Sequence, residues 1–265
     1  RRAPTGAENV LALLARGLRR RGHGVTVAAP EGWVLAPELR QSGVELRPVA
    51  ARGCWLVQWA PQPAPLQLWR LLRYLAPDRG SAALRRLMRE LDPDVVHVNC
   101  LPHLRGAAAA RACGLPVVWH LHEILPPGLR RRCFARRLRR DATRIVAVSE
   151  AVASWLREEG LGGIVEVVLN GVAAPATMPD REAARARIGL PAEVAAIGLF
   201  SQLVPHKGAL DFVRAAHLAA EREPGLWFLI AGRGPRAFVA LLEREIAAGP
   251  AASRIRLLPP LPEIW

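Results

Sequence analysis

Short apolar segments alternate with longer amphipathic segments along most of this chain. Residues 94–98, 116–121 and 144–148 are apolar runs, and the stretches that follow them carry apolar residues at helical spacing. Near-continuous apolar strands separated by helices form parallel sheets that helices cover on both faces. The order of segments therefore predicts an α/β protein built on parallel sheets.

The same reading assigns elements to the whole chain. The predicted strands are residues 25–29, 44–49, 94–98, 116–121, 144–148, 164–169, 194–201, 226–231 and 254–258. The predicted helices are residues 8–21, 66–76, 81–91, 103–113, 129–140, 150–159, 208–222 and 235–248. Residues 54–65 hold two Trp and three Pro without a clear period, and we interpret them as a loop.

The alternation is interrupted once, at residues 170–180, where Gly171 and two prolines stand. We place a domain boundary there, which gives an N-terminal domain at 1–172 and a C-terminal domain at 173–265, both Rossmann-like. In such folds ligands bind at the carboxyl ends of the strands, so we expect a cleft lined by those ends. The first domain opens on a helix and the second stops after three strands, so we expect both to be cut from a longer protein and the three strands to expose apolar faces.

Composition narrows the classes of partner. The formal net charge is +14, but all basic residues except Lys207 are arginines, which indicates a compositional bias toward arginine. No nucleic-acid recognition motif accompanies the charge, so we predict no nucleic-acid partner. The four cysteines, Cys54, Cys100, Cys113 and Cys133, have neither zinc-site nor disulfide spacing. With no apolar run of about 18 residues either, the chain is expected to be cytoplasmic, with reduced thiols and no metal cofactor.

Lys207 is the first candidate for chemistry, since it is the only lysine in a chain that uses arginine elsewhere. It stands between a predicted strand and a predicted helix, where backbone amides and the positive end of a helix favour phosphate. A compact ammonium also reaches phosphate oxygens in places where a guanidinium fits poorly. Gly6 opens the first predicted helix and is a second candidate for a phosphate-binding turn, although a plain helix start explains it equally well.

Histidines gather where strands are predicted to end. His120 and His122 alternate along one strand and point to the same side, with His122 at the very end. His97 and Asn99 are placed similarly on the preceding strand, and we expect all of them to line the ligand cleft. Two histidines without a third ligand are a weak metal site.

The segment Asn170-Gly171 follows a predicted strand. It is interpreted as a turn in which glycine takes a positive φ, bordering the cleft.

The helix at 129–140 is rich in arginine. Leu129, Cys133, Phe134 and Leu138 form its apolar stripe, and the basic residues considered for contact are Arg130, Arg131, Arg136 and Arg137. Such a helix suits an anionic membrane surface or an anionic acceptor. A solvated face in an arginine-biased chain is the other interpretation, and the sequence leaves both open.

Taken in order, eight segments resemble those of family 4 glycosyltransferases of the GT-B type. They are residues 5–8 (TGAE), 21–27 (RGHGVTV), 93–97 (PDVVH), 116–123 (PVVWHLHE), 145–150 (IVAVSE), 168–172 (VLNGV), 202–208 (QLVPHKG) and 229–235 (LIAGRGP). The resemblance implies two Rossmann-like domains facing across a cleft, and a metal-independent, retaining transfer of a sugar from a nucleotide-sugar donor. The donor would sit on the C-terminal domain, and a glycan, lipid-linked or small-molecule acceptor on the N-terminal one, as in enzymes of polysaccharide synthesis at the inner face of the membrane.

Carried over by this resemblance, Lys207 would hold the donor diphosphate, the loop at Gly6 would approach it, and His122 would contact the transferred sugar. Gln202 stands where the family usually has an arginine and Ala173 where it usually has an aspartate, and the ExxxxxxxE element that the family has later does not follow residues 229–235 here. Two alternatives therefore stay open: a nucleotide-sugar 2-epimerase of the same fold, and a non-catalytic nucleotide- or glycan-binding fragment.

Overall fold

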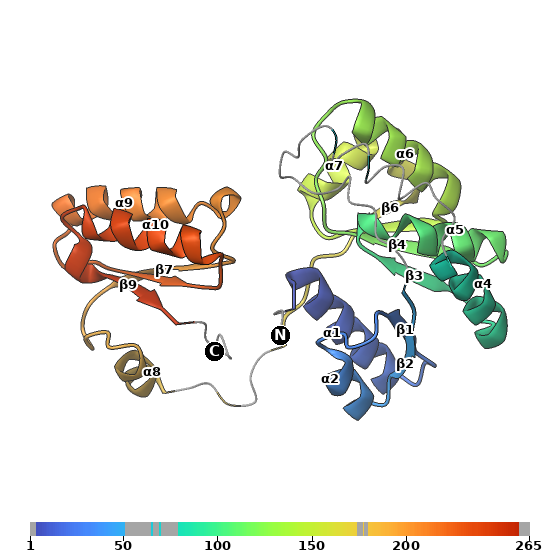
Figure 1. Cartoon of the computed structure of the whole chain (residues 1–265), viewed down its shortest axis with the longest axis horizontal. Coiled ribbons are helices and arrows are strands. Elements are labelled where there is room, and N and C mark those ends of the chain that lie inside the picture. Colours follow the sequence, from blue (N-terminus) through green and yellow to red (C-terminus); the bar gives the residue numbers. More distant parts are fainter. Residues whose placement is uncertain are drawn as a thin grey trace. The chain divides into compact units, whose positions relative to one another are not determined.

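The computed structural model describes residues 4–50, 79–173 and 180–259, together with Pro65, Trp69 and Thr177 (Figure 1). It divides into two compact units, Arg1–Ala173 and Ala174–Trp265, a division one residue away from the boundary predicted at 172/173. The predicted loop at 54–65 and the predicted helix at 66–76 lie outside the described residues, except for Pro65 and Trp69.

The first unit contains two groups of elements. The first group is α1 (Gly6–Arg20), β1 (Thr26–Ala29), α2 (Ala36–Gln41) and β2 (Glu45–Pro48). The second group is α4 (Arg79–Leu91), β3 (Val96–Asn99), the 3-10 turn η2 (Leu101–His103), α5 (Leu104–Ala112), β4 (Val117–Leu121), α6 (Leu129–Asp141), β5 (Arg144–Ala147), α7 (Glu150–Glu158), the 3-10 turn η3 (Gly162–Ile164) and β6 (Val165–Val167).

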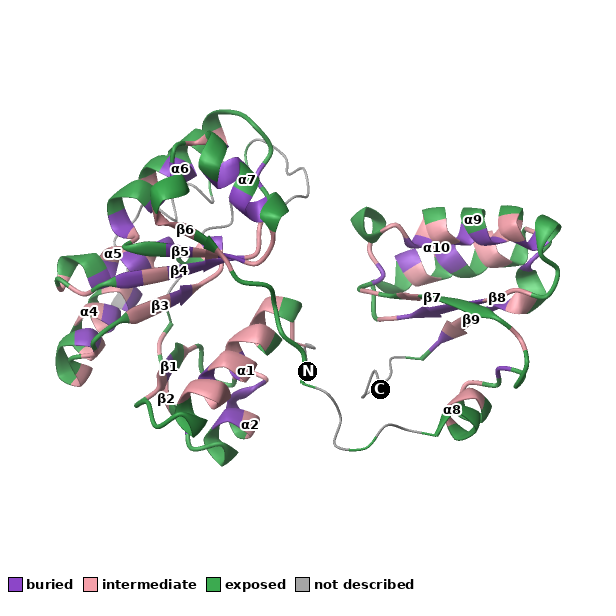
Figure 2. Cartoon of the chain, turned by 180° about the vertical axis from the view of Figure 1, so that it is seen from behind, coloured by how far each residue is buried: buried purple, intermediate pink, exposed green. Residues whose placement is uncertain are grey.

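Among the described residues of this unit, the strands form a two-stranded sheet, β1-β2, and a four-stranded sheet in the order β3-β4-β5-β6. Every pairing is parallel, which confirms the predicted α/β class. The larger sheet carries the main core, and Trp119, Leu121 and Ile145 have no exposed surface (Figure 2). Helices α4 to α7 contribute apolar residues to the same cluster. Burying large apolar side chains against the sheet supplies most of the driving force for this packing.

The β1-β2 group has a separate small core, which includes Ala12 and Ala15 of α1 and Leu39 of α2. Among the described residues, polar contacts join it to the group of the larger sheet. Arg47 of β2 pairs with Glu90 of α4 at 3.1 Å, and the Asn99 side chain at the end of β3 donates to the carbonyl oxygen of Ala7 at 3.1 Å. The second contact brings the first turn of α1 to the carboxyl end of the larger sheet.

The second unit contains α8 (Arg181–Arg187), β7 (Ala196–Phe200), the 3-10 turn η4 (Pro205–Lys207), α9 (Ala209–Arg222), β8 (Trp227–Ala231), α10 (Arg236–Ala247), the 3-10 turn η5 (Ala252–Arg254) and β9 (Ile255–Leu258). Its described strands form one parallel sheet in the order β7-β8-β9. Helices α9 and α10 cover one face and α8 lies on the other (Figures 1 and 2).

The expectation that all three strands expose apolar faces is correct only for β7. Ile197 and Phe200 are about half exposed, at 46% and 52%. Leu229 of β8 and Leu258 of β9 are buried against Leu190, which follows α8. Neither α8 nor α2 was predicted, because six or seven residues are too few to display a helical period.

Candidate active site

Three histidines and an asparagine meet at the carboxyl ends of β3 and β4. The parallel register pairs Asn99 with His120, and His97 lies two residues before Asn99, so these side chains share one face of the sheet. His122 comes directly after β4 and returns to that face. The ring centroids of His97 and His120 are 5.4 Å apart, and those of His120 and His122 are 4.5 Å apart. The structure thus brings together the three histidines and Asn99.

A chain of hydrogen bonds connects this cluster to the first helix. Nε2 of His122 lies 3.1 Å from Oδ1 of Asn99, and Nδ2 of Asn99 donates to the carbonyl oxygen of Ala7 at 3.1 Å. Gly6 precedes Ala7, is exposed, and has open space where a Cβ would be. The first turn of α1, which contains Gly6, therefore borders the cluster.

The same turn is a well-capped helix start. Thr5 Oγ1 accepts from the Glu8 amide, and the Glu8 carboxylate accepts from the Thr5 amide and from the Trp33 indole. This is a capping box, which accounts for the residue types at positions 5 and 8 by helix stability alone. It also places a carboxylate in this turn, so the turn is less suited to phosphate than the sequence suggested.

Burial makes the imidazoles weak bases. Burial, with a smaller contribution from the neighbouring His122, lowers the pKa of His97 and of His120 from 6.5 to about 4. Burial also lowers the pKa of His122. All three rings are therefore neutral near pH 7, and they act as hydrogen-bonding groups rather than as cations.

Glu123 is a residue of this site that the sequence reasoning passed over, although it adjoins His122. Its carboxylate accepts from the backbone amides of Leu101 and His122, at 3.1–3.2 Å. Burial raises the pKa of this carboxyl group. Cys100, which precedes Leu101, has a positive φ of 71°, a conformation that an L-residue adopts only where its surroundings hold it. Glu123 thus holds the turn after β3 in shape.

Lys207 lies in the second unit, in the loop between β7 and α9. Its side chain is exposed. Gly208 follows in the left-handed region, with φ of 75°, and is the N-cap of α9. A glycine is favoured here because other residues are strained at this φ. The turn ends at the N-terminus of a 14-residue helix, the positive end of its dipole.

The loops after β7 and β8 are joined by backbone hydrogen bonds at the carboxyl end of this sheet. The amide of Ser201 donates to the carbonyl of Ala231 at 3.1 Å, and the amide of Leu203 donates to the carbonyl of Arg233 at 2.8 Å. Gly232 allows the approach, since a Cβ there would lie 1.8 Å from a backbone oxygen of the other loop. A Cβ on Gly234 would lie 2.1 Å from another such oxygen. The loops after β7 and β8 therefore behave as one surface.

Residues 201–208 and 232–236, which make these loops, include Lys207, Arg233 and Arg236 and no acidic residue. All three side chains are exposed. Arg233 is a residue of this surface that was not predicted, although its position between Gly232 and Gly234 was a signal in the sequence. Gln202 is exposed in the same loop as Lys207.

The remaining predicted residues lie elsewhere. Asn170 and Gly171 are exposed in the irregular segment after β6, outside the histidine cluster. The turn expected there is wrong in one respect, because Gly171 is absent from the glycines with positive φ. This position therefore does not depend on the ability of glycine to adopt a positive φ.

The interpretation of α6 as an apolar stripe with a free basic face needs correction. Leu129 is 77% exposed and Cys133 is exposed, whereas Arg131 is only 6% exposed. Arg131 pairs with Glu158 at 2.6 Å and with Glu159 at 2.8 Å, so it joins α6 to α7. Arg137 pairs with Asp141 at 2.9 Å.

Two of the arginines proposed for a membrane or an acceptor are therefore occupied by carboxylates within the unit. Arg136 is exposed and Arg130 half-buried.

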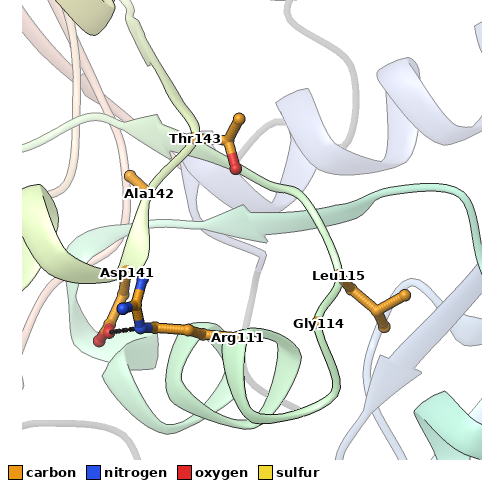
Figure 3. Close-up of a pocket in the computed structure, with 6 residues that line it drawn as sticks. All are labelled: Arg111, Gly114, Leu115, Asp141, Ala142 and Thr143. Atoms are coloured by element: carbon orange, nitrogen blue, oxygen red, sulfur yellow. Dashed lines mark ion pairs between the residues drawn. The ribbon is translucent and has the colours of Figure 1, made fainter.

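A hollow of about 290 Å³ lies in the first unit, lined by Arg111, Gly114, Leu115, Asp141, Ala142 and Thr143 (Figure 3). These residues precede β4 and β5, so the hollow is at the amino ends of the strands, opposite the histidine cluster. Asp141 in its wall is fully buried and pairs with Arg140 at 2.7 Å and with Arg111 at 3.9 Å. Ligands of open parallel sheets bind at the carboxyl ends of the strands, which is the opposite end of this sheet.

Within the described parts of the chain, no group of three or more His, Cys, Asp or Glu side chains is arranged to hold a metal ion. In those same parts, every helix is too short or too polar to cross a lipid bilayer.

Comparisons with known proteins agree with this geometry. A family model described as Glycosyltransferase Family 4 matches residues 4–174. Anabaena HepE in complex with UDP has the same fold, with a TM-score of 0.74 and 22% identity over 99% of this chain and 68% of HepE. A glycosyltransferase from Rickettsia africae matches with a TM-score of 0.73 and 17% identity, over 97% of this chain and 65% of that one.

A Listeria monocytogenes protein described as a candidate UDP-N-acetylglucosamine 2-epimerase also shares the fold. Its TM-score is 0.56 and its identity 12%, over 98% of this chain and 68% of that one. The chain thus spans about two thirds of the length of these solved proteins. A search of curated proteins finds no match. The family model covers more than half of the residues, and on that ground the chain belongs to glycosyltransferase family 4.

Proposed function

We propose that this protein transfers a sugar, with retention of anomeric configuration, from a nucleotide-sugar donor to a glycan, lipid-linked or small-molecule acceptor. The observation that carries the proposal is the surface formed by the loops after β7 and β8. The two loops combine exposed Lys207 and Arg233 and contain no carboxylate, and they lead into the start of α9, whose first turn carries the exposed Asp211. This combination suits a diphosphate. Membership of glycosyltransferase family 4 supports the same reaction class.

In this reaction the bond between the sugar's anomeric carbon and the diphosphate oxygen breaks, and a bond from that carbon to an acceptor oxygen forms. The acceptor hydroxyl loses its proton, and the leaving diphosphate gains negative charge. Fixed cations placed where this charge develops lower the barrier. Lys207 would supply one such charge and Arg233 a second, in place of the arginine that Gln202 replaces. We propose that the protein needs no metal ion for this step.

The two units would divide the work. The second unit would hold the donor at the carboxyl ends of its strands. The first unit would hold the acceptor, with His122 hydrogen-bonded to the transferred sugar. UDP-glucose is the first donor to test, because HepE has been solved in complex with it.

The test is release of UDP from UDP-glucose, measured with and without a chelator, in wild type and in charge variants. Lys207→Ala should raise the barrier by about 3–4 kcal/mol, the amount typical for a preorganised group at a developing charge. Lys207→Arg should fall between. Arg222→Ala is the matched control, because it removes an exposed cation from the opposite end of α9. Wild-type turnover in Lys207→Ala, or loss of activity on chelation, would contradict the proposal.

An epimerase of the same fold is the second candidate, since the carboxylate of Glu123 stands beside His122. That carboxylate is already engaged by two backbone amides, which makes it a poor base for abstracting a proton from the sugar. Analysis of the products separates the two functions, because an epimerase changes the sugar and needs no acceptor.

A further inference from the structure

The orientation of the Asn99 amide is determined by its two partners. The carbonyl oxygen of Ala7 only accepts hydrogen bonds, so the atom of Asn99 that lies 3.1 Å from it is the NH₂ group. The other atom, Oδ1, then faces Nε2 of His122 at 3.1 Å. Flipping the amide would place two acceptors against each other at the Ala7 contact. Asn99 therefore presents an acceptor to His122.

This orientation fixes the hydrogen on the imidazole. Because Oδ1 of Asn99 only accepts, Nε2 of His122 must donate. A neutral ring carries one hydrogen, which leaves Nδ1 as an acceptor. The titratable neighbours favour the neutral ring: His97 and His120 are uncharged near pH 7. Of the nearby carboxylates, Glu123 is bound to backbone amides and Glu8 to Thr5 and Trp33.

A second observation indicates that this place accommodates hydrogen-bonding groups. His120 is 94% buried, given its 6% exposure, and in the described part of the chain neither of its ring nitrogens has a hydrogen-bond partner. The same holds there for Nδ1 of His97. Buried polar atoms are nearly always satisfied by protein, water or ligand. The ring of His120 lies against that of His122, and the ring of His97 meets that of His120 edge-on, so the unsatisfied nitrogens mark a polar site next to His122.

We infer that Asn99 is a positioning residue that holds His122 as the Nε2–H tautomer, so that its Nδ1 accepts a hydrogen bond from a hydroxyl group of the transferred sugar. The sugar part of this inference rests on the proposed function. Asn99 also ties this arrangement to the first turn of α1 through Ala7. A displacement of that turn would release the amide and with it the preference between the two tautomers.

The direct test is nitrogen NMR of histidine-labelled wild-type protein near pH 7, with His122→Gln to assign the signal. The Nε2 signal of His122 should be that of a protonated nitrogen and the Nδ1 signal that of an unprotonated one. Asn99→Ala should abolish this preference and give a mixture of tautomers. Asn9→Ala is the matched control, because Asn9 is an exposed asparagine of α1. Wild-type His122 in the Nδ1–H or doubly protonated form would overturn the inference.

Kinetics with UDP-glucose add a readout that depends on position. Asn99→Ala should lower kcat by about 10- to 100-fold, the range found when a partner that orients a functional ligand is removed, while the affinity for UDP stays unchanged. Asn99→Asp keeps an acceptor for Nε2 of His122 but loses the donor to Ala7 and adds a charge, so relative to Asn99→Ala it should restore the Nε2–H form and shift the pH profile upward. An unchanged kcat in Asn99→Ala would count against the inference.

The two proposals fail separately. If no nucleotide sugar is turned over while His122 has the expected tautomer, the proposed function is wrong and the positioning by Asn99 stands. If UDP-glucose is turned over while the tautomer is the other one, only the inference about Asn99 is wrong.

Discussion

His97 and His120 are polar side chains at positions where an apolar side chain would cost less free energy to bury. His120 loses nearly all contact with water on folding, and in the described residues its ring gains no hydrogen bond in return. His97 is half-buried, and its Nδ1 is likewise buried there without a partner. Their pKa values are low because burial disfavours the charged form of the imidazole. Sites that bind ligands commonly retain such groups at the expense of stability.

The two histidines should make stability depend on pH. Between pH 6.5 and about 4, the unfolded chain binds protons that the folded chain excludes. The free energy of unfolding should therefore fall as the pH falls below 6.5, by up to about 1.4 kcal/mol per pH unit for each group, and level off below about pH 4. Urea unfolding at several pH values measures this.

The variant His97→Gln/His120→Gln isolates these groups from Glu123, whose raised pKa acts in the opposite direction. In this variant most of the fall in the free energy of unfolding below pH 6.5 should disappear. The variant His23→Gln, at an exposed position, should keep that fall. Equal slopes in wild type and the double variant would contradict the assignment.

At the level of single residues, the sequence was informative where position along a strand decides the outcome. The placement of His122, Asn99 and His97 on one face follows from alternation and from strand ends, whereas the role of Lys207, which its rarity suggests, stays a prediction. The partners of Arg131 lie 27 and 28 residues away on another helix. The helical period of 3.6 residues predicts that Arg131 is exposed to solvent. Only the tertiary structure shows the carboxylates that allow its burial.

Among the helices, α6 depends on that buried arginine. Arg131→Ala should destabilise the first unit by about 3 kcal/mol, at the low end for breaking a buried ion pair, because Glu158 is itself largely exposed. Arg136→Ala on the exposed face of the same helix should change stability by less than about 0.5 kcal/mol. Thermal or urea unfolding compares them, and equal effects would show that Arg131 is not the link to α7.

The paired loops of the second unit depend on glycine. Gly232→Ala would place a methyl group against a backbone oxygen, so the loops after β7 and β8 must separate. We expect a stability loss of about 1–3 kcal/mol, as for other overpacked sites, and weaker binding of UDP by calorimetry. Gly225→Ala has open space around the added methyl group and should leave UDP binding intact. Full affinity in Gly232→Ala would mean that the junction does not shape the donor surface.

Elements with a strong period were predictable and short ones were not. Strands such as β4 and helices such as α9 lie within a few residues of their predicted bounds. The contact that joins the loops after β7 and β8 was invisible in the sequence, because backbone hydrogen bonds between distant loops leave only a pair of glycines as a trace. Arg233 was passed over for the same reason.

For the whole molecule, each of the two units has its own buried apolar clusters, and no cluster contains residues of both units. Calorimetry should resolve two unfolding transitions, since domains with separate cores usually unfold as separate units. UDP at 100 times its dissociation constant should stabilise the second unit by about 2.7 kcal/mol and leave the other transition in place. A single transition would contradict the independence of the two units, and a shift of the first unit alone would contradict the assignment of the donor to the second unit.

Lys207 has one more consequence, which concerns chemical labelling. The chain has a single lysine, and the structure exposes it beside the glycine junction. Apart from the α-amino group, amine-selective reagents therefore have one side chain to modify. A fluorophore attached there would sit within the loop surface without any mutagenesis, and a nucleotide that occupies the surface would slow its attachment. The arginine bias of the rest of the chain makes this loop chemically addressable in the unaltered protein.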